Sequence, residues 1–262
     1  MNSPRFSIIT IALNNLAGLR DTAASVDQQT FTDFEWIVID GGSGDGTLEF
    51  LKARSSDGHP WISERDRGLY DAMNKGLNLA SGSFVIFMNS GDRFADRDVL
   101  ARADRRIALN EPKPDFAFGD AYEESATGEL FLKPSRPAKS ISRGMFTHHQ
   151  AMFYAREAIG DRRYDQRFRL AADYHFTSRL LAKGARVCSL DFPVCVFKRG
   201  GFSEATAKLG RRENLLVQKE VFGLSLAHRT YNHLSLLASA FLRKYMRSFY
   251  DRLRYRQAVS NS

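Results

Sequence analysis

The chain has 262 residues, of which 43% are hydrophobic, and carries a formal net charge of +8. This length and composition fit a soluble protein with a sizeable core, and no apolar run approaches the roughly 20 residues that a membrane-spanning helix needs. The two cysteines, Cys188 and Cys195, have no metal-site or disulfide spacing, and residues 1–4 lack the features of a signal peptide, so we expect a cytoplasmic protein with reduced thiols.

The first part of the chain alternates between the patterns of strands and helices. Short apolar runs rich in β-branched residues predict strands at 6–13, 34–39, 61–63 and 84–88. Apolar residues at helical spacing predict helices near 16–26, 47–54 and 69–80, with Asp45 or Thr47 capping the second and Gly82 stopping the third. This alternation is typical of an α/β fold with a mostly parallel central sheet.

After Asp92 the pattern is less regular. We expect helices at 98–109 and 170–183, strands at 116–119, 151–154, 186–190 and 194–197, a hairpin at 122–132 and a basic loop at 133–143. From residue 206 onward the chain has a helical pattern. We therefore divide it into one domain at 1–205 and a C-terminal helical, basic extension at 206–262.

The extension has the pattern of an amphipathic helix. One side of the helix is aromatic and apolar, and the opposite side is cationic. Such a helix can lie in a membrane interface and contact anionic lipid. The alternative is that the apolar side packs on the preceding domain. The apolar side holds Leu234, Ala238, Phe241, Leu242, Tyr245 and Phe249, and the basic side holds Arg243, Lys244, Arg247 and Arg254.

Three acids stand at the ends of predicted strands or in the loops that follow them: Asp40, Asp66 and Asp92. Ligands of an open parallel sheet bind off the carboxyl ends of its strands, so Asp92 and the loop 64–68 are expected to face one crevice. Asp40 alone is equally consistent with binding a nucleobase or ribose and with stabilising its own turn. The glycines at 42–46 follow the second strand and do not form a dinucleotide fingerprint.

Four segments carry a resemblance to a known family: FSIITIALNN, FEWIVIDGGSGDGT, ISERDRGLYDAMNKGLNLASG and FVIFMNSGD. Weaker similarity continues in THHQAMFY and RLAADYHF. Together they resemble glycosyltransferase family 2, in the subgroup of bacterial exopolysaccharide enzymes that includes colanic acid glycosyltransferases. The resemblance implies the GT-A fold, a Rossmann-like nucleotide-diphospho-sugar transferase fold, over about residues 5 to 205.

The resemblance also implies which residues bind a nucleotide-sugar donor. Asp40 matches the acid that binds the base, and Thr10 and Ala12 lie where the first strand lines that pocket. Asp66 matches an acid that holds the base or ribose. Lys75 lies near the position of a cationic partner for the diphosphate.

The implied metal site departs from the family pattern. Asp92 matches the last acid of the metal-binding region, whereas the two acids of the usual motif fall at Asn89 and Gly91. The family's usual arginine likewise falls at Met73. A single carboxylate is still adequate for Mg²⁺ or Mn²⁺, because such ions take one or two carboxylates together with phosphate oxygens and waters.

Asp173 matches the acid that serves as the general base. Its apolar surroundings are expected to raise its pKa, and the alternative role is a helix N-cap. His148 and His149 lie on a loop before a strand as candidate acceptor or metal ligands, or as unrelated loop histidines. Gly200–Ser203 is either a loop over the donor or a simple turn.

The resemblance implies an inverting glycosyltransferase that moves a sugar from a UDP- or GDP-sugar to a saccharide acceptor. The expected acceptor is carried on a polyprenyl diphosphate lipid, in exopolysaccharide or surface glycan synthesis, which would place the enzyme on the inner face of the plasma membrane.

Two other classes of protein are considered as alternatives. A nucleic-acid-binding protein would use the basic extension, but residues 1–200 lack the interleaved basic and aromatic residues expected of it, so no nucleic-acid partner is expected. A nucleotidyltransferase would need a glycine-rich basic loop after the first strand, where residues 12–15 read ALNN.

Overall fold

In the computed structural model the described residues are 3–198, 207–246 and 256–257. The strands are β1 (Phe6–Ala12), β2 (Phe34–Asp40), β3 (Trp61–Ser63), β4 (Phe84–Phe87), β5 (Arg93–Phe94), β6 (Phe116–Glu124), β7 (Leu130–Lys133), β8 (Met152–Ala155), β9 (Val187–Lys198) and β10 (Arg256–Gln257). The helices are α1 (Leu16–Asp27), α2 (Thr47–Ala53), α3 (Leu69–Leu79), α4 (Val99–Ala108), α5 (Arg156–Ile159), α6 (Ala172–Leu181), α8 (Ala207–Phe222) and α9 (Leu226–Tyr245).

The strands form one sheet in the order β10-β7-β6-β8-β4-β1-β2-β3, with β9 paired to both β5 and β6. β3, β2, β1 and β4 run parallel to one another, as the alternation of strands and helices predicts. β8 lies antiparallel between β4 and β6, so the sheet is mixed beyond β4. The α/β class is confirmed.

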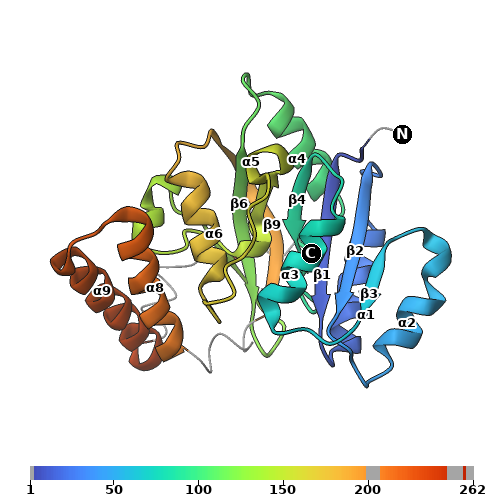
Figure 1. Ribbon diagram of the computed structural model, residues 1–262, viewed down its shortest axis with the longest axis horizontal. Helices are drawn as coiled ribbons and strands as arrows, with labels where there is room; N and C mark the ends of the chain where they lie inside the picture. The colour runs from blue at the N-terminus through green and yellow to red at the C-terminus, as the bar shows by residue number, and fades with distance from the viewer. Residues whose placement is uncertain (1–2, 199–206, 247–255, 258–262) are drawn as a thin grey trace.

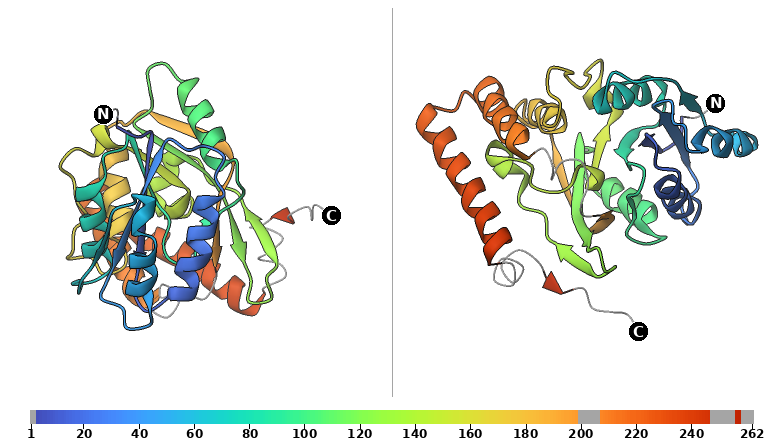
Figure 2. Two further views of the ribbon diagram at one scale, coloured as in Figure 1. Left: turned by 90° about the vertical axis from the view of Figure 1, so that its right-hand side faces the viewer. Right: turned by 90° about the horizontal axis from the view of Figure 1, so that it is seen from below.

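Both faces of the sheet are covered by helices, because successive residues of a buried strand point to opposite sides. Ile8 of β1 packs in a core that also contains side chains of α1 and α4, whereas its neighbour Ile9 packs with α3 and α6. The left view of Figure 2 shows α3 and α6 on one side of the sheet and α1 and α4 on the other. The parallel strands are therefore buried between two helical layers, and loops follow at their carboxyl ends.

Gly76 allows α3 to approach β1 closely. A methyl group at this position would collide with the buried side chain of Ile9. Overpacking a core costs about 1–3 kcal/mol, and alanine recovers about 1 kcal/mol of helix propensity. We therefore expect Gly76→Ala to lower the free energy of unfolding, as measured by chemical denaturation. Gly44→Ala is the matched control, because nothing lies within 4 Å of a Cβ there; equal stabilities of the two variants would contradict this packing.

The segments predicted as separate strands at 186–190 and 194–197 form one strand, β9. The prediction of two strands was wrong because Pro193 interrupts the sequence pattern, whereas the chain continues through a shift of register against β6 at this residue. Gly119 of β6 makes room for the irregularity, since a Cβ there would lie 2.5 Å from the carbonyl oxygen of Phe192.

Smaller differences concern helix ends. The N-cap of α2 is Gly46 and not Asp45 or Thr47, although the Asp45 carboxylate accepts the Thr47 N–H at 3.2 Å. α3 ends at Leu79, before Gly82. The helical spacing over 69–80 predicts that Leu69 lies on the apolar face of α3, but this residue is 43% exposed because it stands at the first position of the helix, beyond the edge of the core.

In the C-terminal segment α8 packs on α6, and α9 packs on the outer side of α8 (Figures 1 and 2). The side of α9 that faces away from α8 is apolar and exposed. In the described residues this side therefore does not pack on the preceding domain, which was the alternative to a membrane contact. Phe249, Arg247 and Arg254, like the Gly200–Ser203 loop, lie outside the described residues. Across the described residues, each helix is too short or too polar to span a bilayer. The exposed apolar residues of α9 include Leu226, Tyr231, Leu234, Leu237, Phe241 and Tyr245.

Candidate active site

The strands of the parallel half end at one rim of the sheet. Ala12 pairs with Asp40 and Asp40 pairs with Ser63, so the carboxyl ends of β1, β2 and β3 are aligned. The chain after β4 reaches the same level, because the Ser90 N–H donates to the carbonyl oxygen of Ile11 at 3.1 Å. The loops that carry the three predicted acids therefore leave the sheet along one edge.

Asp40 is fully buried at the end of β2. Its carboxylate accepts hydrogen bonds from the Ser43 hydroxyl at 2.5 Å and the Ser43 N–H at 3.2 Å, and from the Ser63 hydroxyl at 2.6 Å. These contacts correspond to the turn-stabilising role that the sequence left open. For Asp40 to bind a nucleobase, the base would have to displace one of these serine donors.

Asp66 is held by Lys75. The lysine Nζ lies 2.6 Å from Asp66 Oδ1 and 2.7 Å from Glu64 Oε1. Burial opposes the charge on Lys75, but the hydrogen bonds to these two carboxylates outweigh it and raise the lysine pKa. Lys75 therefore positions Asp66, and its charge is already compensated. Gly41 makes room for Asp66, since a Cβ at Gly41 would lie 2.9 Å from Asp66 Oδ2.

Thr10 and Ala12 lie on β1 below the rim. The Thr10 side chain is fully buried, and its hydroxyl accepts a hydrogen bond from Trp36 Nε1 at 2.9 Å. It therefore faces the core, which differs from the expectation that it lines the donor pocket. Ala12 is at the strand end, where its carbonyl oxygen accepts the Gly41 N–H at 2.9 Å.

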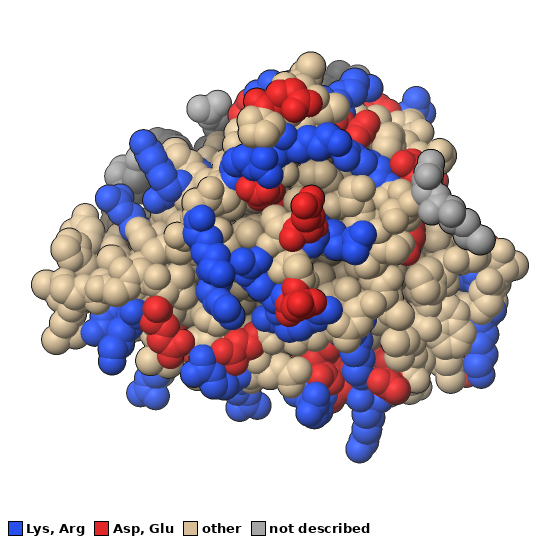
Figure 3. All heavy atoms as spheres, turned by 45° about the horizontal axis from the view of Figure 1, so that its top comes forward, with Lys and Arg blue, Asp and Glu red and all other residues tan. Residues whose placement is uncertain are grey.

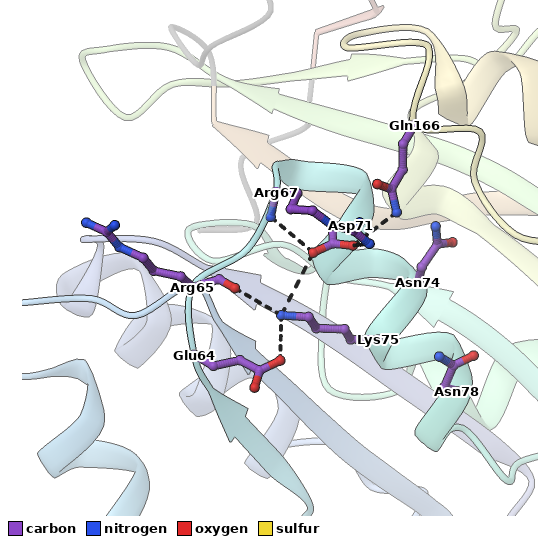
Figure 4. A pocket seen from close by; sticks show the side chains of 8 residues that line it. All are labelled: Glu64, Arg65, Arg67, Asp71, Asn74, Lys75, Asn78 and Gln166. Atoms are coloured by element: carbon purple, nitrogen blue, oxygen red, sulfur yellow. Dashed lines mark hydrogen bonds and ion pairs between the residues drawn. The ribbon is translucent and has the colours of Figure 1, made fainter.

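A polar pocket of about 500 Å³ lies beside Lys75, between the loop after β3 and the outer face of α3 (Figure 4). Acids and bases that line it already pair with one another, as Arg67 does with Asp71 at 3.2 Å. Arg65 is different, because its side chain extends away from the other lining residues and its Cγ lies 3.6 Å from the position of a Cβ on Gly42. Within the described ranges Arg65 forms no ion pair, so it offers an uncompensated positive charge beside the rim.

Asp92 is buried, with 6% of its surface exposed. Its Oδ2 accepts a hydrogen bond from Gln150 Nε2 at 2.7 Å. Burial raises the pKa of Asp92 to about 7, and hydrogen bonds from Gln150 and the Lys198 backbone oppose that rise. Gln150 therefore stabilises the ionised form of this carboxylate and fixes its orientation.

The oxygen atoms suited to a divalent cation here belong to Asp92 and Asn89. Asn89 Oδ1 is buried and lacks a hydrogen-bond partner among the described residues. The ranges 3–198, 207–246 and 256–257 contain no group of three or more His, Cys, Asp or Glu side chains placed to hold a metal. Mg²⁺ takes one or two carboxylates with phosphate oxygens and waters, so these residues fit a cation whose shell is completed by a bound diphosphate.

The loop that carries Asn89 and Asp92 is fixed against α1 and its N-cap, Asn15. Asn15 Nδ2 donates to the Ser90 carbonyl oxygen at 3.0 Å, and the Thr22 hydroxyl donates to the Asp92 carbonyl oxygen at 2.7 Å. Gly91 has a φ of +101°, in the region that favours glycine. This loop conformation accounts for the glycine at a position where the family pattern has an acid.

Asp173 lies in the first turn of α6 and is not its N-cap, which is Ala171. The carboxylate Oδ1 accepts the Tyr174 N–H at 2.7 Å and lies 3.2 Å from the Tyr70 hydroxyl. Burial raises the pKa of Asp173 to about 6, although the side chain keeps partial access to solvent. Tyr70 stands in the first turn of α3, directly after the loop that carries Asp66, so its hydroxyl is a contact between that end of α3 and Asp173.

The two histidines already have partners. His149 is buried, its Nε2 lies 2.8 Å from the Tyr164 hydroxyl, and burial lowers its pKa to about 3, so it is a neutral core side chain. His148 Nε2 lies 2.9 Å from Glu123 and 3.0 Å from Lys133 Nζ. Neither histidine belongs to a metal-binding cluster in the described part of the chain.

Three site residues were not predicted from the sequence: Gln150, Tyr70 and Arg65. Gln150 directly follows the two histidines in THHQAMFY, so the similarity of that segment was the available signal. Tyr70 and Arg65 lie in ISERDRGLYDAMNKG, the segment that also holds the predicted residues Asp66 and Lys75, so the similarity of that segment was the available signal.

Comparisons of the sequence with known proteins all find glycosyltransferases. The model of Glycosyl transferase family 2 matches residues 7–180. A "PGL/p-HBAD biosynthesis glycosyltransferase" of Mycobacterium bovis (strain BCG) is 36% identical over 197 residues, covering 71% of this chain and 73% of the relative. An uncharacterized glycosyltransferase of Mycobacterium tuberculosis is 33% identical over 233 residues, covering 85% of this chain and 87% of the relative.

Solved structures share the fold at low sequence identity. S. aureus TarS 1–349 in complex with UDP-GlcNAc has a TM-score of 0.62 and 19% identity, covering 92% of this chain and 74% of that one. The mannosyltransferase PcManGT from Pyrobaculum calidifontis, in complex with GDP-Man and Mn²⁺, has a TM-score of 0.62 and 18% identity, covering 83% of this chain and 63% of that one. The GT-A fold expected from the sequence is confirmed.

Proposed function

Because this chain belongs to glycosyl transferase family 2, and is therefore a glycosyltransferase, we propose that it inverts the anomeric carbon as it transfers a sugar from a nucleotide-diphosphate sugar to a saccharide acceptor. The observation that carries the proposal is the convergence of the loops bearing Asp40, Asp66 and Asp92 on one rim of the sheet. Membership of this family also argues against the two other classes considered, a nucleic-acid-binding protein and a nucleotidyltransferase.

The donor lies across this rim. Asp66 and Asp40 hold the nucleoside, with Ala12 at the floor where β1 ends. Arg65 binds the diphosphate. The charge of Lys75 is already compensated by Asp66 and Glu64, whereas Arg65 has no ion pair among the described residues. The UDP-GlcNAc and GDP-Man complexes of the two similar folds support this class of donor.

Asp92 and Asn89 hold a divalent cation, Mg²⁺ or Mn²⁺, together with the donor diphosphate. Such an ion supplies positive charge where the leaving diphosphate develops negative charge. Gln150 keeps Asp92 oriented by donating to its Oδ2 at 2.7 Å. The Mn²⁺ in the PcManGT complex supports this assignment.

Asp173 accepts the proton of the acceptor hydroxyl as its oxygen attacks the anomeric carbon from the face opposite the diphosphate. Burial raises the pKa of Asp173 to about 6. At neutral pH the carboxylate is therefore mostly ionised, and it is a stronger base than an exposed aspartate. Attack opposite the leaving group inverts the anomeric configuration.

The proposal is tested by nucleotide release. The purified chain is incubated with a panel of UDP- and GDP-sugars, with Mn²⁺ or with EDTA, and free UDP or GDP is measured. We expect release from one nucleotide class, increased by Mn²⁺, with water as a slow acceptor and faster with an acceptor saccharide. Absence of release from every donor in the panel would contradict the proposed function.

The acceptor is proposed to be a saccharide carried on a polyprenyl diphosphate lipid, in exopolysaccharide or surface glycan synthesis, at the inner face of the plasma membrane. The support lies in α9, whose outward side exposes Leu234 (58%), Phe241 (56%) and Tyr245 (64%). The end of the molecule formed by α9 carries few charged side chains in Figure 3. The sequence adds basic residues from Arg243 onward, which fit an anionic lipid surface.

We expect the triple variant Leu234→Gln, Phe241→Gln, Tyr245→Gln to lose membrane binding. Each apolar side chain contributes on the order of 1 kcal/mol or more when buried in lipid, so binding is expected to weaken more than tenfold. The measurement is co-sedimentation with vesicles of phosphatidylglycerol and phosphatidylcholine. The control replaces three exposed apolar residues elsewhere, Leu109, Leu130 and Val187, by glutamine. If the α9 variant sediments like the wild type, the membrane assignment is wrong.

A further inference from the structure

Glu213 of α8 makes a concentrated set of contacts with the segment that leads to Asp173. Its carboxylate is buried, with 6% of the residue exposed. Oε1 accepts the Arg169 N–H at 2.9 Å, and Oε2 accepts the N–H groups of Leu170 at 2.8 Å and Ala171 at 2.9 Å. Three consecutive backbone donors therefore share one carboxylate from a different part of the chain.

These contacts occur where α6 begins. Ala171 is the N-cap of α6 and has no side-chain oxygen to accept the free N–H groups at the helix start. Glu213 places a negative charge at the same end of α6, which the helix dipole favours. The segment is also held from the other side, because the Tyr70 hydroxyl lies 2.8 Å from the Leu170 carbonyl oxygen. Both contacts fix the backbone just before Asp173.

We propose that Glu213 is the positioning residue for Asp173, and that α8 is therefore a part of the active site and not only a support for α9. The inference rests on the proposed role of Asp173 as the base. It goes beyond the family comparison, because the match to the family model ends at residue 180, before α8 begins. Removal of the Glu213 carboxylate would let the backbone before Asp173 shift, and with it the base.

The first test is Glu213→Gln. The amide oxygen can keep some of the three N–H donors, but the NH₂ group cannot accept the others. We expect kcat for nucleotide release to fall by about 10- to 100-fold, as for a displaced catalytic group, while KM for the donor and the thermal shift produced by UDP or GDP with Mn²⁺ stay unchanged. Glu220→Gln is the matched control, because Glu220 is on the same helix and meets Arg167 at the surface at 3.4 Å.

The second test combines Glu213→Gln with Asp173→Asn. If Glu213 acts through Asp173, the double variant is expected to have the kcat of Asp173→Asn alone, because the effects of coupled residues do not add. A purely structural role predicts a further loss in the double variant and weaker nucleotide binding. Either of those results, or a kcat of Glu213→Gln equal to that of Glu220→Gln, would overturn the inference.

A third variant covers the case in which Glu213→Gln does not fold. Glu213→Asp keeps the charge and withdraws the carboxylate by one methylene, so the same loss in kcat without a change in donor KM is expected. Wild-type kcat in Glu213→Asp would then contradict the inference. Failure of the proposed function is recognised separately, since in that case the wild-type chain itself releases no nucleotide.

Discussion

Replacement of Asp173 by asparagine is expected to lower kcat by about 10²- to 10⁴-fold, the usual contribution of a general base. The amide oxygen of asparagine can still accept the Tyr174 N–H that Asp173 accepts at 2.7 Å, so the start of α6 is retained. Asparagine cannot take up the acceptor proton. The affinity for UDP or GDP is expected to stay unchanged, because the rim residues are intact. Nucleotide release measures the first effect and a thermal-shift titration the second.

The same base predicts a pH dependence. Because burial raises the pKa of Asp173 to about 6, the kcat of the wild type, measured at saturating donor and Mn²⁺ so that the cation keeps Asp92 ionised, is expected to be level above that pH and to fall as the pH drops through it, when the base becomes protonated. The residual activity of Asp173→Asn should lack this acid limb. Asp161→Asn, at an exposed acid on the connection before α6, is the control. Wild-type turnover in Asp173→Asn would remove the base assignment.

Replacement of Asp92 by alanine is expected to abolish the part of nucleotide binding that depends on metal. In the proposed cation site Asp92 supplies the carboxylate, and Asn89 supplies an amide oxygen that has no hydrogen-bond partner among the described residues. Loss of the charged ligand should raise the Kd for UDP or GDP in Mn²⁺ more than about tenfold, a loss of about 1.4 kcal/mol or more. Calorimetric titration in Mn²⁺ and in EDTA measures the effect, and the two Kd values of Asp92→Ala are expected to coincide.

Asp96→Ala controls for the loss of an acid from the same connection. Asp96 is exposed and pairs with Arg102 at 2.6 Å, away from the Gln150 contact that orients Asp92. This variant is expected to bind the nucleotide more tightly in Mn²⁺ than in EDTA, as the wild type does. A metal-dependent gain in affinity that survives in Asp92→Ala would place the cation elsewhere.

The parallel half of the fold was predictable because its signals are local. The apolar runs at 34–39 and 84–88 coincide with β2 and β4 within one residue at each end, and the strand at 61–63 coincides with β3. Since parallel strands must end at one rim, the convergence of the loops after them followed from the topology alone. The raised pKa of Asp173 followed from the apolar residues around it in the sequence.

What could not be predicted depends on contacts between distant residues. No local pattern tells that Lys75 is compensated by Glu64 and Asp66, or that the Asp40 carboxylate is occupied by two serines. The hydrogen bond from Gln150 to Asp92 joins residues that are 58 positions apart in the sequence. His149 resembles a ligand in the sequence, and only its burial beside Tyr164 identifies it as a core residue.

One rim of the sheet is the proposed binding site of a nucleotide-diphosphate sugar. The most direct test is a crystal structure of the chain with Mn²⁺ and the nucleoside diphosphate that the release assay identifies. We expect the diphosphate beside Asp92 and Arg65, and the nucleoside against Asp66 and the end of β1. A nucleotide bound instead in the polar pocket along the outer face of α3, with the rim empty, would contradict the account.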